Sequence, residues 1–269
     1  MIGTRVLQAL IMTTLAGLST GIGGAIGIFA KRSNTRFLSF ALGLSVGVMV
    51  YISFIEMMPE SAKLLMASYG EKNGLLIQLI SFFAGMLFIA LIDKLVPSED
   101  NPHEAENWDV VCEHCDKQSK SLEKTGILTA LAIAVHNFPE GMASFVSAMR
   151  DSSVGIAILV AIAIHNIPEG MAAAAPIYYG TGNKKKAFLY SLLSGLAEPL
   201  GALVVWLVMG PYMSDKLYGM LYAAISGIMI FISFDELLPS AQTYGAHHIS
   251  LTGVVIGMVL MAVSLLMFM

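Results

Sequence analysis

His136-Asn137-Phe138-Pro139-Glu140-Gly141-Met142-Ala143 and His165-Asn166-Ile167-Pro168-Glu169-Gly170-Met171-Ala172 are two near-copies of one octapeptide, in consecutive apolar stretches of the chain. A histidine and a glutamate four residues apart share one face of a helix, so each copy presents an imidazole and a carboxylate together. Both copies lie near the middle of stretches long enough to cross a bilayer. An ionisable side chain at that depth costs about 2.5–3.5 kcal/mol on insertion scales. The repeat therefore predicts a charged, metal-binding site inside a membrane.

The composition is that of an integral membrane protein. Of the 269 residues, 56% are hydrophobic and only 13% are charged, whereas a soluble domain has about 25% charged residues. Apolar stretches near the length of a spanning helix lie at about 5–30, 37–60, 75–96, 126–149, 154–178, 187–209, 217–240 and 251–269. We therefore expect an all-α protein whose eight transmembrane helices form one domain over residues 1–269. The net charge of −4 does not point to nucleic acid.

The distribution of Lys and Arg orients the predicted helices. On one side of the membrane the loops and helix ends carry ten basic residues: Lys31, Arg32, Arg36, Lys94, Lys117, Lys120, Lys124, Lys184, Lys185 and Lys186. On the other side they carry five: Arg5, Lys63, Lys72, Arg150 and Lys216. Because cytoplasmic loops are richer in Lys and Arg, this asymmetry predicts that both termini lie outside.

The one long polar connection, residues 97–124, is predicted to be a cytoplasmic loop between the third and fourth spans. It carries both cysteines of the chain, Cys112 and Cys115, together with His103 and His114. A reducing compartment argues against a disulfide. A Cys-x-x-Cys with nearby histidines suits zinc, but a second Cys-x-x-Cys is missing. The loop is therefore either a metal-binding segment or an acidic, solvated one.

A second pair of segments suggests an internal repeat. Ser53-Phe54-Ile55-Glu56-Met57-Met58-Pro59 ends the second span, and Ser233-Phe234-Asp235-Glu236-Leu237-Leu238-Pro239 ends the seventh. These spans run in opposite directions in the predicted topology, as do the two spans that carry the octapeptides. The pattern predicts a twofold axis in the membrane plane, as in inverted-repeat transporters. Chance resemblance between apolar helices is the alternative.

The acidic residues of this pair lie at different depths. Glu56 is predicted near the outer end of its helix, and Asp235 and Glu236 near the cytoplasmic end of theirs. They would suit the entrance and exit of a cation path. The alternative is that they are interfacial residues exposed to lipid headgroups and water.

The prolines and glycines of the octapeptides have predictable effects. Pro139 and Pro168 should each free the carbonyl four residues earlier, which is tolerated at membrane depth where it lines a wet cavity. Gly141 and Gly170 remove side-chain bulk, so we expect them to let the two octapeptide helices approach each other closely. The two ligand faces could then meet.

Together the two faces would bring His136, Glu140, His165 and Glu169 into one site, to which the sixth span adds Glu198 within Ala197-Glu198-Pro199. Three unpaired carboxylates would cost about 9 kcal/mol, and the spans offer no central Lys or Arg as partners. A divalent cation is the natural counter-charge. Imidazole with carboxylate suits Zn²⁺, Fe²⁺, Co²⁺, Ni²⁺ or Mn²⁺ better than Ca²⁺ or Mg²⁺.

Asn137 and Asn166, which follow the two histidines, allow two interpretations. Their amide oxygens could bind a second, adjacent metal that shares Glu140 and Glu169. Alternatively, the amides could bond the carbonyls that the prolines free, those of Val135 and Ile164.

These motifs resemble those of the ZIP family of metal transporters: His-Asn-x-Pro-Glu-Gly in the fourth span, its repeat in the fifth, and Ala-Glu-Pro in the sixth. The resemblance implies a transport domain in a cell membrane, with eight helices in an inverted 3+2+3 arrangement, and uptake of Zn²⁺, and also Fe²⁺, Mn²⁺, Co²⁺ and Cd²⁺, as substrates rather than cofactors. It implies a binuclear site, with His136, Glu140, His165, Glu169 and Glu198 at the first metal and Asn137, Glu140, Asn166 and Glu169 at the second. It also implies a homodimer.

An intramembrane zinc hydrolase is the alternative from another class of protein. Such an enzyme needs three protein ligands, an open water position and a general base, often within His-Glu-x-x-His. Here the acid lies four residues beyond each histidine, and the set is duplicated. Among transporters, an exporter remains open, as does the choice between proton coupling and channel-like flow.

Overall fold

The computed structural model describes residues 2–29, 35–95, 115–150, 152–212, 214–244 and 247–268, within which every regular element is a helix. The first half contains α1 (Ile2–Phe29), α2 (Thr35–Ile52), the π-helical turn η1 (Ser53–Met57), α3 (Met58–Tyr69) and α4 (Glu71–Leu95). The octapeptides lie in α5 (Cys115–Arg150) and α6 (Ser152–Thr181). The rest consists of α7 (Lys184–Gly195), α8 (Ala197–Met209), the short 3₁₀ turn η2 (Gly210–Tyr212), α9 (Asp215–Ile232), the π-helical turn η3 (Ser233–Leu237), α10 (Leu238–Tyr244) and α11 (His247–Phe268).

Seven helical segments within the described residues are long and apolar enough to cross a membrane: Thr4–Phe29, Ser39–Tyr69, Glu71–Ile92, Gly155–Thr181, Lys184–Val208, Asp215–Asp235 and His247–Met267. They correspond to seven of the eight stretches expected from the sequence, which confirms an all-helical, integral membrane protein. The eighth stretch, 126–149, is helical within α5, although some of its side chains fall outside the described part. α5 begins at Cys115, so the last ten residues of the expected 97–124 loop are helical.

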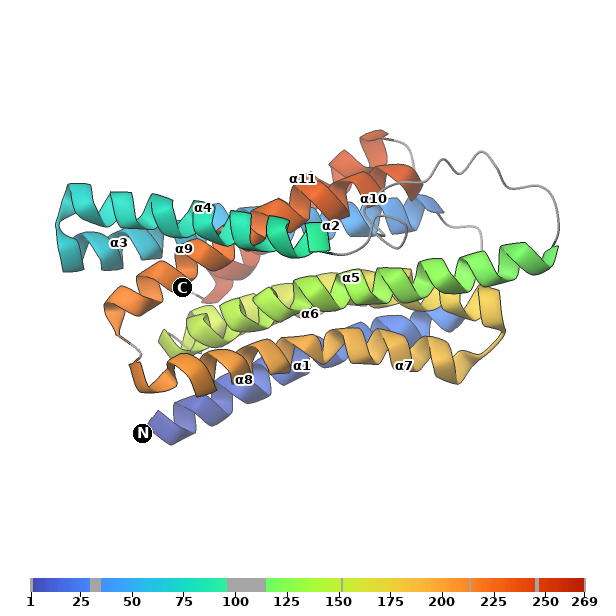
Figure 1. Cartoon of the computed structure of the whole chain (residues 1–269), viewed down its shortest axis with the longest axis horizontal. Helices are drawn as coiled ribbons and strands as arrows, with labels where there is room; N and C mark the ends of the chain where they lie inside the picture. Colours follow the sequence, from blue (N-terminus) through green and yellow to red (C-terminus); the bar gives the residue numbers. More distant parts are fainter. Residues whose placement is uncertain are drawn as a thin grey trace.

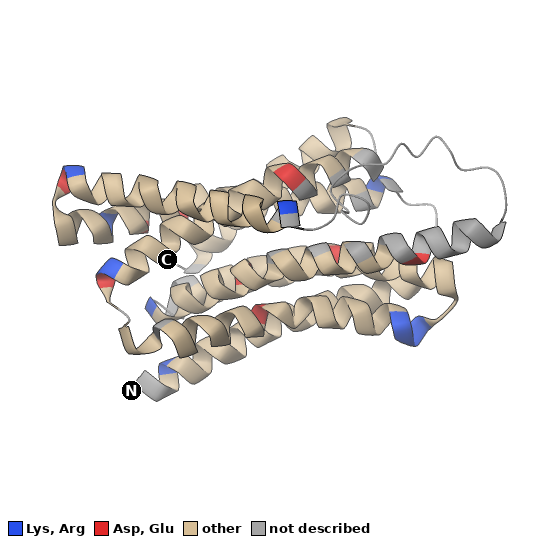
Figure 2. Ribbon diagram, in the orientation of Figure 1, with Lys and Arg blue, Asp and Glu red and all other residues tan. Residues whose placement is uncertain are grey.

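The helices form two layers that lie side by side (Figure 1). One layer, which we call the octapeptide layer, consists of α1, α5, α6, α7 and α8. The other, the flanking layer, consists of α2, α3, α4, α9, α10 and α11. The layers meet where α6 packs against α2 and α11 and where α5 packs against α9. Figure 2 shows Lys and Arg near the ends of the helices, whereas several acidic residues lie along their middle.

Glycines bring the helices of the flanking layer into close contact. A Cβ atom on Gly47 of α2 would lie 2.0 Å from the carbonyl oxygen of Val254 in α11, and one on Gly257 of α11 would lie 2.1 Å from that of Leu44. α4 and α9 cross in the same reciprocal way through Gly85 and Gly227. Because no side chain separates these backbones, each crossing excludes any residue larger than glycine without a shift of the helices.

The two π-helical turns coincide with the second sequence pair and contact each other's helices reciprocally. The Ser53 hydroxyl lies 4.0 Å from Sδ of Met229, and the Ser233 hydroxyl lies 3.9 Å from Sδ of Met49. Each methionine lies four residues before its own serine. The two turns therefore make matching contacts with each other's helices.

Candidate metal site

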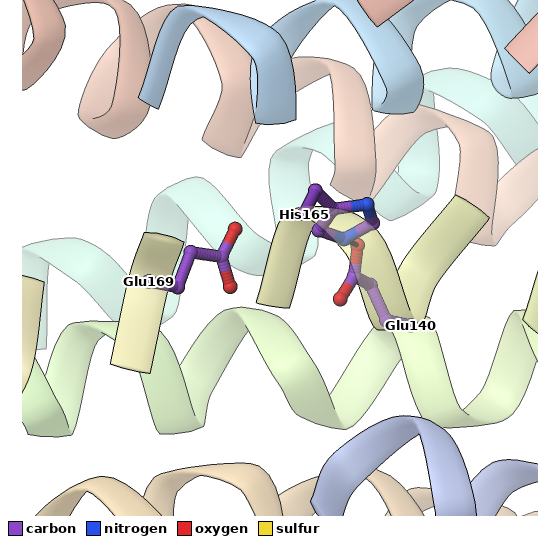
Figure 3. Close-up of side chains that lie close together, drawn as sticks. All are labelled: Glu140, His165 and Glu169. Carbon is purple, nitrogen blue, oxygen red and sulfur yellow. Dashed lines mark hydrogen bonds and ion pairs between the residues drawn. The ribbon is translucent and has the colours of Figure 1, made fainter. Parts of the chain in front are cut away.

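Three ionisable side chains from the two octapeptides converge between α5 and α6. Glu140 of α5 and His165 and Glu169 of α6 each offer a ligand atom, and these atoms lie within 4.8 Å of one another. Glu140 Oε1 lies 2.9 Å from His165 Nε2. All three side chains are almost fully buried (Figure 3). The expected meeting of the two ligand faces is therefore seen for these residues.

The convergence follows from helix geometry. His165 and Glu169 are four residues apart, so they project from one face of α6, and Figure 3 shows Glu140 rising from α5 toward that face. Pro139 and Pro168 lie inside continuous helices, close to this point in each. His136 lies in α5 one turn before Glu140, but its side chain is outside the described part of the chain.

The site carries more negative charge than its described surroundings can neutralise. Glu140, Glu169 and Glu198 are all fully buried, and no Lys or Arg is buried among the described side chains. Glu140 Oε2 and Glu198 Oε2 have no hydrogen-bond partner within the described residues. A buried carboxylate oxygen without a partner is costly, and none of the described groups at these two oxygens supplies a positive charge, so this arrangement favours a bound cation as the counter-charge.

The two asparagines donate to carbonyls of neighbouring helices. Asn137 Nδ2 donates to the Ser194 carbonyl at 3.2 Å, and Asn166 Nδ2 donates to the Ala16 carbonyl at 3.1 Å. Their Oδ1 atoms accept no hydrogen bond from any described residue. The amides are therefore held by α7 and α1 and not by the carbonyls of Val135 and Ile164. This geometry leaves both amide oxygens available as metal ligands.

Glu198 enters the site from a separate helix. α7 ends at Gly195 and α8 begins at Ala197, so Glu198 lies in the first turn after the break. Its Oε1 accepts a short hydrogen bond from Asn166 Nδ2. Glu198 is not part of the three-residue cluster, and its described contact is with an asparagine.

The expected role of the two octapeptide glycines is wrong in one respect. A Cβ atom on Gly141 would lie 2.0 Å from the Glu198 carbonyl oxygen of α8, and one on Gly170 would lie 1.9 Å from the Thr20 carbonyl oxygen of α1. These glycines thus bring α8 and α1 close to the octapeptide helices, instead of bringing α5 and α6 together. The residue after a glutamate is turned by about 100° around the helix, so it faces a different neighbour.

The remaining candidate residues lie elsewhere. Glu56 is half-buried in η1 and Asp235 is exposed in η3, and neither belongs to the cluster. The side chain of Glu236 is outside the described residues. So are His103, Cys112 and His114 of the loop, and the side chain of Cys115.

Methionines that sequence analysis did not single out line the same site. A cavity of about 10 Å³, room for one water-sized sphere, is bounded by Glu140 and His165 and by Met49, Met229 and Met261. A methionine in a span is usually a packing residue. Only Met49 and Met229 share a sequence signal, because each lies four residues before the serine of its π-helical turn, and Met261 has no such signal. The polarisable thioether sulfurs of the three methionines thus line the cavity next to the harder nitrogen and oxygen atoms of His165 and Glu140.

Comparison with known proteins gives consistent matches. The model of the ZIP zinc transporter family matches residues 94–265. A protein named zinc transporter ZupT from Streptococcus mutans is 52% identical over 264 residues, covering 98% of both chains. Proteins of the same name from Clostridium perfringens and Oceanobacillus iheyensis are 51% and 53% identical, cover 98% of this chain, and are themselves covered over 97% and 98% of their lengths.

Proposed function

Because this chain belongs to the ZIP family of zinc transporters, we propose that it carries Zn²⁺ into the cytosol through the buried site between α5 and α6. Membership of this family and the apolar helices identify the chain as a multi-pass cell-membrane protein. It is a transporter and not an enzyme, which removes the zinc hydrolase as an alternative. Uptake of Fe²⁺, Mn²⁺, Co²⁺ and Cd²⁺ is part of the proposal, because imidazole, carboxylate and amide ligands accept several of these ions.

One observation carries the proposal. Glu140, His165 and Glu169 offer ligand atoms within 4.8 Å of one another in a fully buried position. A charge cluster of this kind, without a buried Lys or Arg among the described residues, is expected where a cation passes through a membrane protein.

The proposed site holds two metal ions. His136, Glu140, His165 and Glu169 would bind the first ion, and Glu140 and Glu169 would bridge it to a second ion that Asn137 and Asn166 also bind. We assign Glu198 to the second ion, because its Oε1 accepts a hydrogen bond from Asn166, which we place at that ion. This differs from the assignment that the family resemblance implied.

The proposed topology has eight spans in an inverted repeat, with both termini outside. The reciprocal contacts of η1 and η3 support the repeat. In this topology Glu56 lies near the entrance and Asp235 and Glu236 near the exit. The Cys-containing loop is cytoplasmic and regulates transport without forming part of the ion path.

A membrane-impermeant maleimide should leave Cys112 and Cys115 unlabelled in sealed cells and label them after permeabilisation with metal removed. Labelling of sealed cells would reverse the orientation.

Zinc uptake by the purified protein tests the function directly. Proteoliposomes that contain the wild-type chain should accumulate labelled Zn²⁺ faster than liposomes that contain the Glu140→Ala, Glu169→Ala variant at equal protein content. Repeating the measurement with and without an imposed pH gradient separates proton coupling from channel-like flow. Equal uptake by the two proteins would refute the proposed site.

We also propose that the protein is a homodimer, which native mass spectrometry of the detergent-purified protein tests.

A further inference from the structure

Two helices flank the octapeptide pair in matching register. Gly17 and Gly195, Thr20 and Glu198, and Gly23 and Gly201 are each 178 positions apart in the sequence. The first member of each pair lies in α1, and the second lies in α7 or α8.

Backbone contacts show that residues 178 positions apart on the two flanking helices also pack on matching residues of the two octapeptides. The octapeptide glycine of α5, Gly141, packs on the Glu198 carbonyl, and that of α6, Gly170, packs on the Thr20 carbonyl. In return, a Cβ atom on Gly201 would lie 2.1 Å from the Phe138 carbonyl oxygen, and one on Gly23 would lie 2.0 Å from the Ile167 carbonyl oxygen. Phe138 and Ile167 occupy the same position in the two octapeptides.

The asparagines follow the same register. Asn137 donates to the Ser194 carbonyl, and Asn166 donates to the Ala16 carbonyl. Ser194 and Ala16 are again 178 positions apart. Each asparagine is therefore held by the flanking helix of the opposite repeat, at matching positions.

The match fails in charge at Thr20 and Glu198. Asn166 also donates to the carboxylate of Glu198, and the residue of α1 that corresponds to Glu198 in this register is Thr20. The Thr20 hydroxyl is fully buried and has no hydrogen-bond partner among the described residues. It lies 2.9 Å from where a Cβ atom of Gly195 would stand, next to the Ser194 peptide that holds Asn137.

We propose that Thr20 determines how the second metal ion is bound, because it offers a neutral hydroxyl oxygen where the other repeat offers the carboxylate of Glu198. This inference rests on the proposed function and goes beyond it. The hydroxyl contacts the ion or a water on it from the Asn137 side. One negative charge thus distinguishes the two sides of an otherwise matched site.

The asymmetry has a chemical reason. A fourth buried carboxylate would add about 3 kcal/mol of burial cost in the metal-free protein. It would also hold a divalent cation more tightly and so slow its release. A hydroxyl supplies an oxygen without that charge. Thr20 is therefore expected to set affinity and release at the second ion, while leaving the His-containing side of the site intact.

Thr20→Val removes the hydroxyl at nearly constant shape, and Thr20→Ser retains it as the matched control. Zinc binding to each purified protein, measured by calorimetry in detergent, should show two classes of site in the wild type. Thr20→Val should weaken the second class by about tenfold, the scale for a group that supports a metal ligand, and leave the first unchanged. Thr20→Ser should bind as the wild type does. Equal binding by the two variants would overturn the proposal.

A carboxylate exchange keeps the test decisive if Thr20→Val fails to fold. Glu198→Thr alone should lose the second zinc ion, and adding Thr20→Glu should restore it, because Thr20 and Glu198 occupy matching positions on two helices that cross closely at Gly17 and Gly195. Failure of the double variant to regain the second ion, while the first still binds, would count against a shared register. Wild-type uptake in proteoliposomes is measured in parallel. Its absence refutes the proposed function, whereas normal uptake with unchanged Thr20 variants refutes only this inference.

Discussion

The octapeptides of α5 and α6 differ at only one of eight positions, yet they meet different partners. In α6, Asn166 contacts the carboxylate of Glu198, whereas in α5 the corresponding Asn137 contacts a backbone carbonyl. The difference comes from the flanking helices: α8 supplies an acid where α1 supplies Thr20. A repeated motif thus lies in asymmetric surroundings, because the side chains that flank it come from helices outside the repeat.

The largest effect is expected when the glutamates and histidines that both octapeptides share are replaced. Alanine at Glu140 or Glu169 should lower zinc uptake by more than about a hundredfold, since even groups that only support a metal ligand contribute 10–100-fold. Alanine at His136 or His165 should rank close behind. Uptake in proteoliposomes, normalised to protein in the membrane, checks this. Wild-type transport by both His136→Ala and Glu140→Ala would mean that the octapeptides are structural.

The next largest effect should distinguish the octapeptide of α5 from that of α6. Alanine at Gly141 or Gly170 places a Cβ atom about 2 Å from a carbonyl oxygen, so the neighbouring helix must move; such overpacking costs about 1–3 kcal/mol. Gly141→Ala displaces Glu198, and Gly170→Ala displaces Thr20, so we expect Gly141→Ala to reduce uptake more at a similar loss of thermal stability. Leu131→Ala, on the exposed side of α5, is the control. Equal loss of uptake would show that Glu198 is no more important than Thr20.

A smaller effect is expected from aspartate at the two asparagines. The Asn166→Asp substitution would place a second carboxylate beside Glu198 and lose the donor to Ala16, whereas the same change at Asn137 loses only the donor to Ser194.

We therefore expect Asn166→Asp to reduce zinc uptake by about tenfold and Asn137→Asp to change mainly the relative uptake of Zn²⁺, Mn²⁺ and Co²⁺. Competitive uptake of these ions measures both effects. The reverse order would contradict the assignment of Glu198 to the Asn166 side.

The smallest effect on transport is expected at the Cys-containing loop, for which we propose a cytoplasmic position. Replacing Cys112, His114 and Cys115 together with alanine should lower the zinc bound per purified protein but leave substantial uptake, because these ligands lie outside the spans. Metal analysis of the purified protein and proteoliposome uptake measure the two quantities. Near-abolished uptake at normal expression would place the loop on the transport path and add a third region to the comparison.

Much of the site could be anticipated from local sequence. The four-residue spacing of His165 and Glu169 fixes a shared helix face, and the apolar stretch around them fixes their depth in the membrane. The need for a cation followed from counting acids against bases in the spans. The π-helical form of Ser53–Met57 and Ser233–Leu237 could not be anticipated, because the same residues would also fit an α-helix.

The sequence by itself thus determined that this chain crosses a membrane and carries imidazole, carboxylate and amide side chains inside its apolar helices, because helix periodicity and hydropathy are local properties. Only the tertiary structure decided which neighbour each face meets. It placed Gly141 against α8 and Gly170 against α1, and it brought Glu198 of α8 into hydrogen-bond contact with Asn166 of α6. Helix periodicity gives the direction of a side chain around its own axis, but the partner depends on how helices distant in sequence pack together.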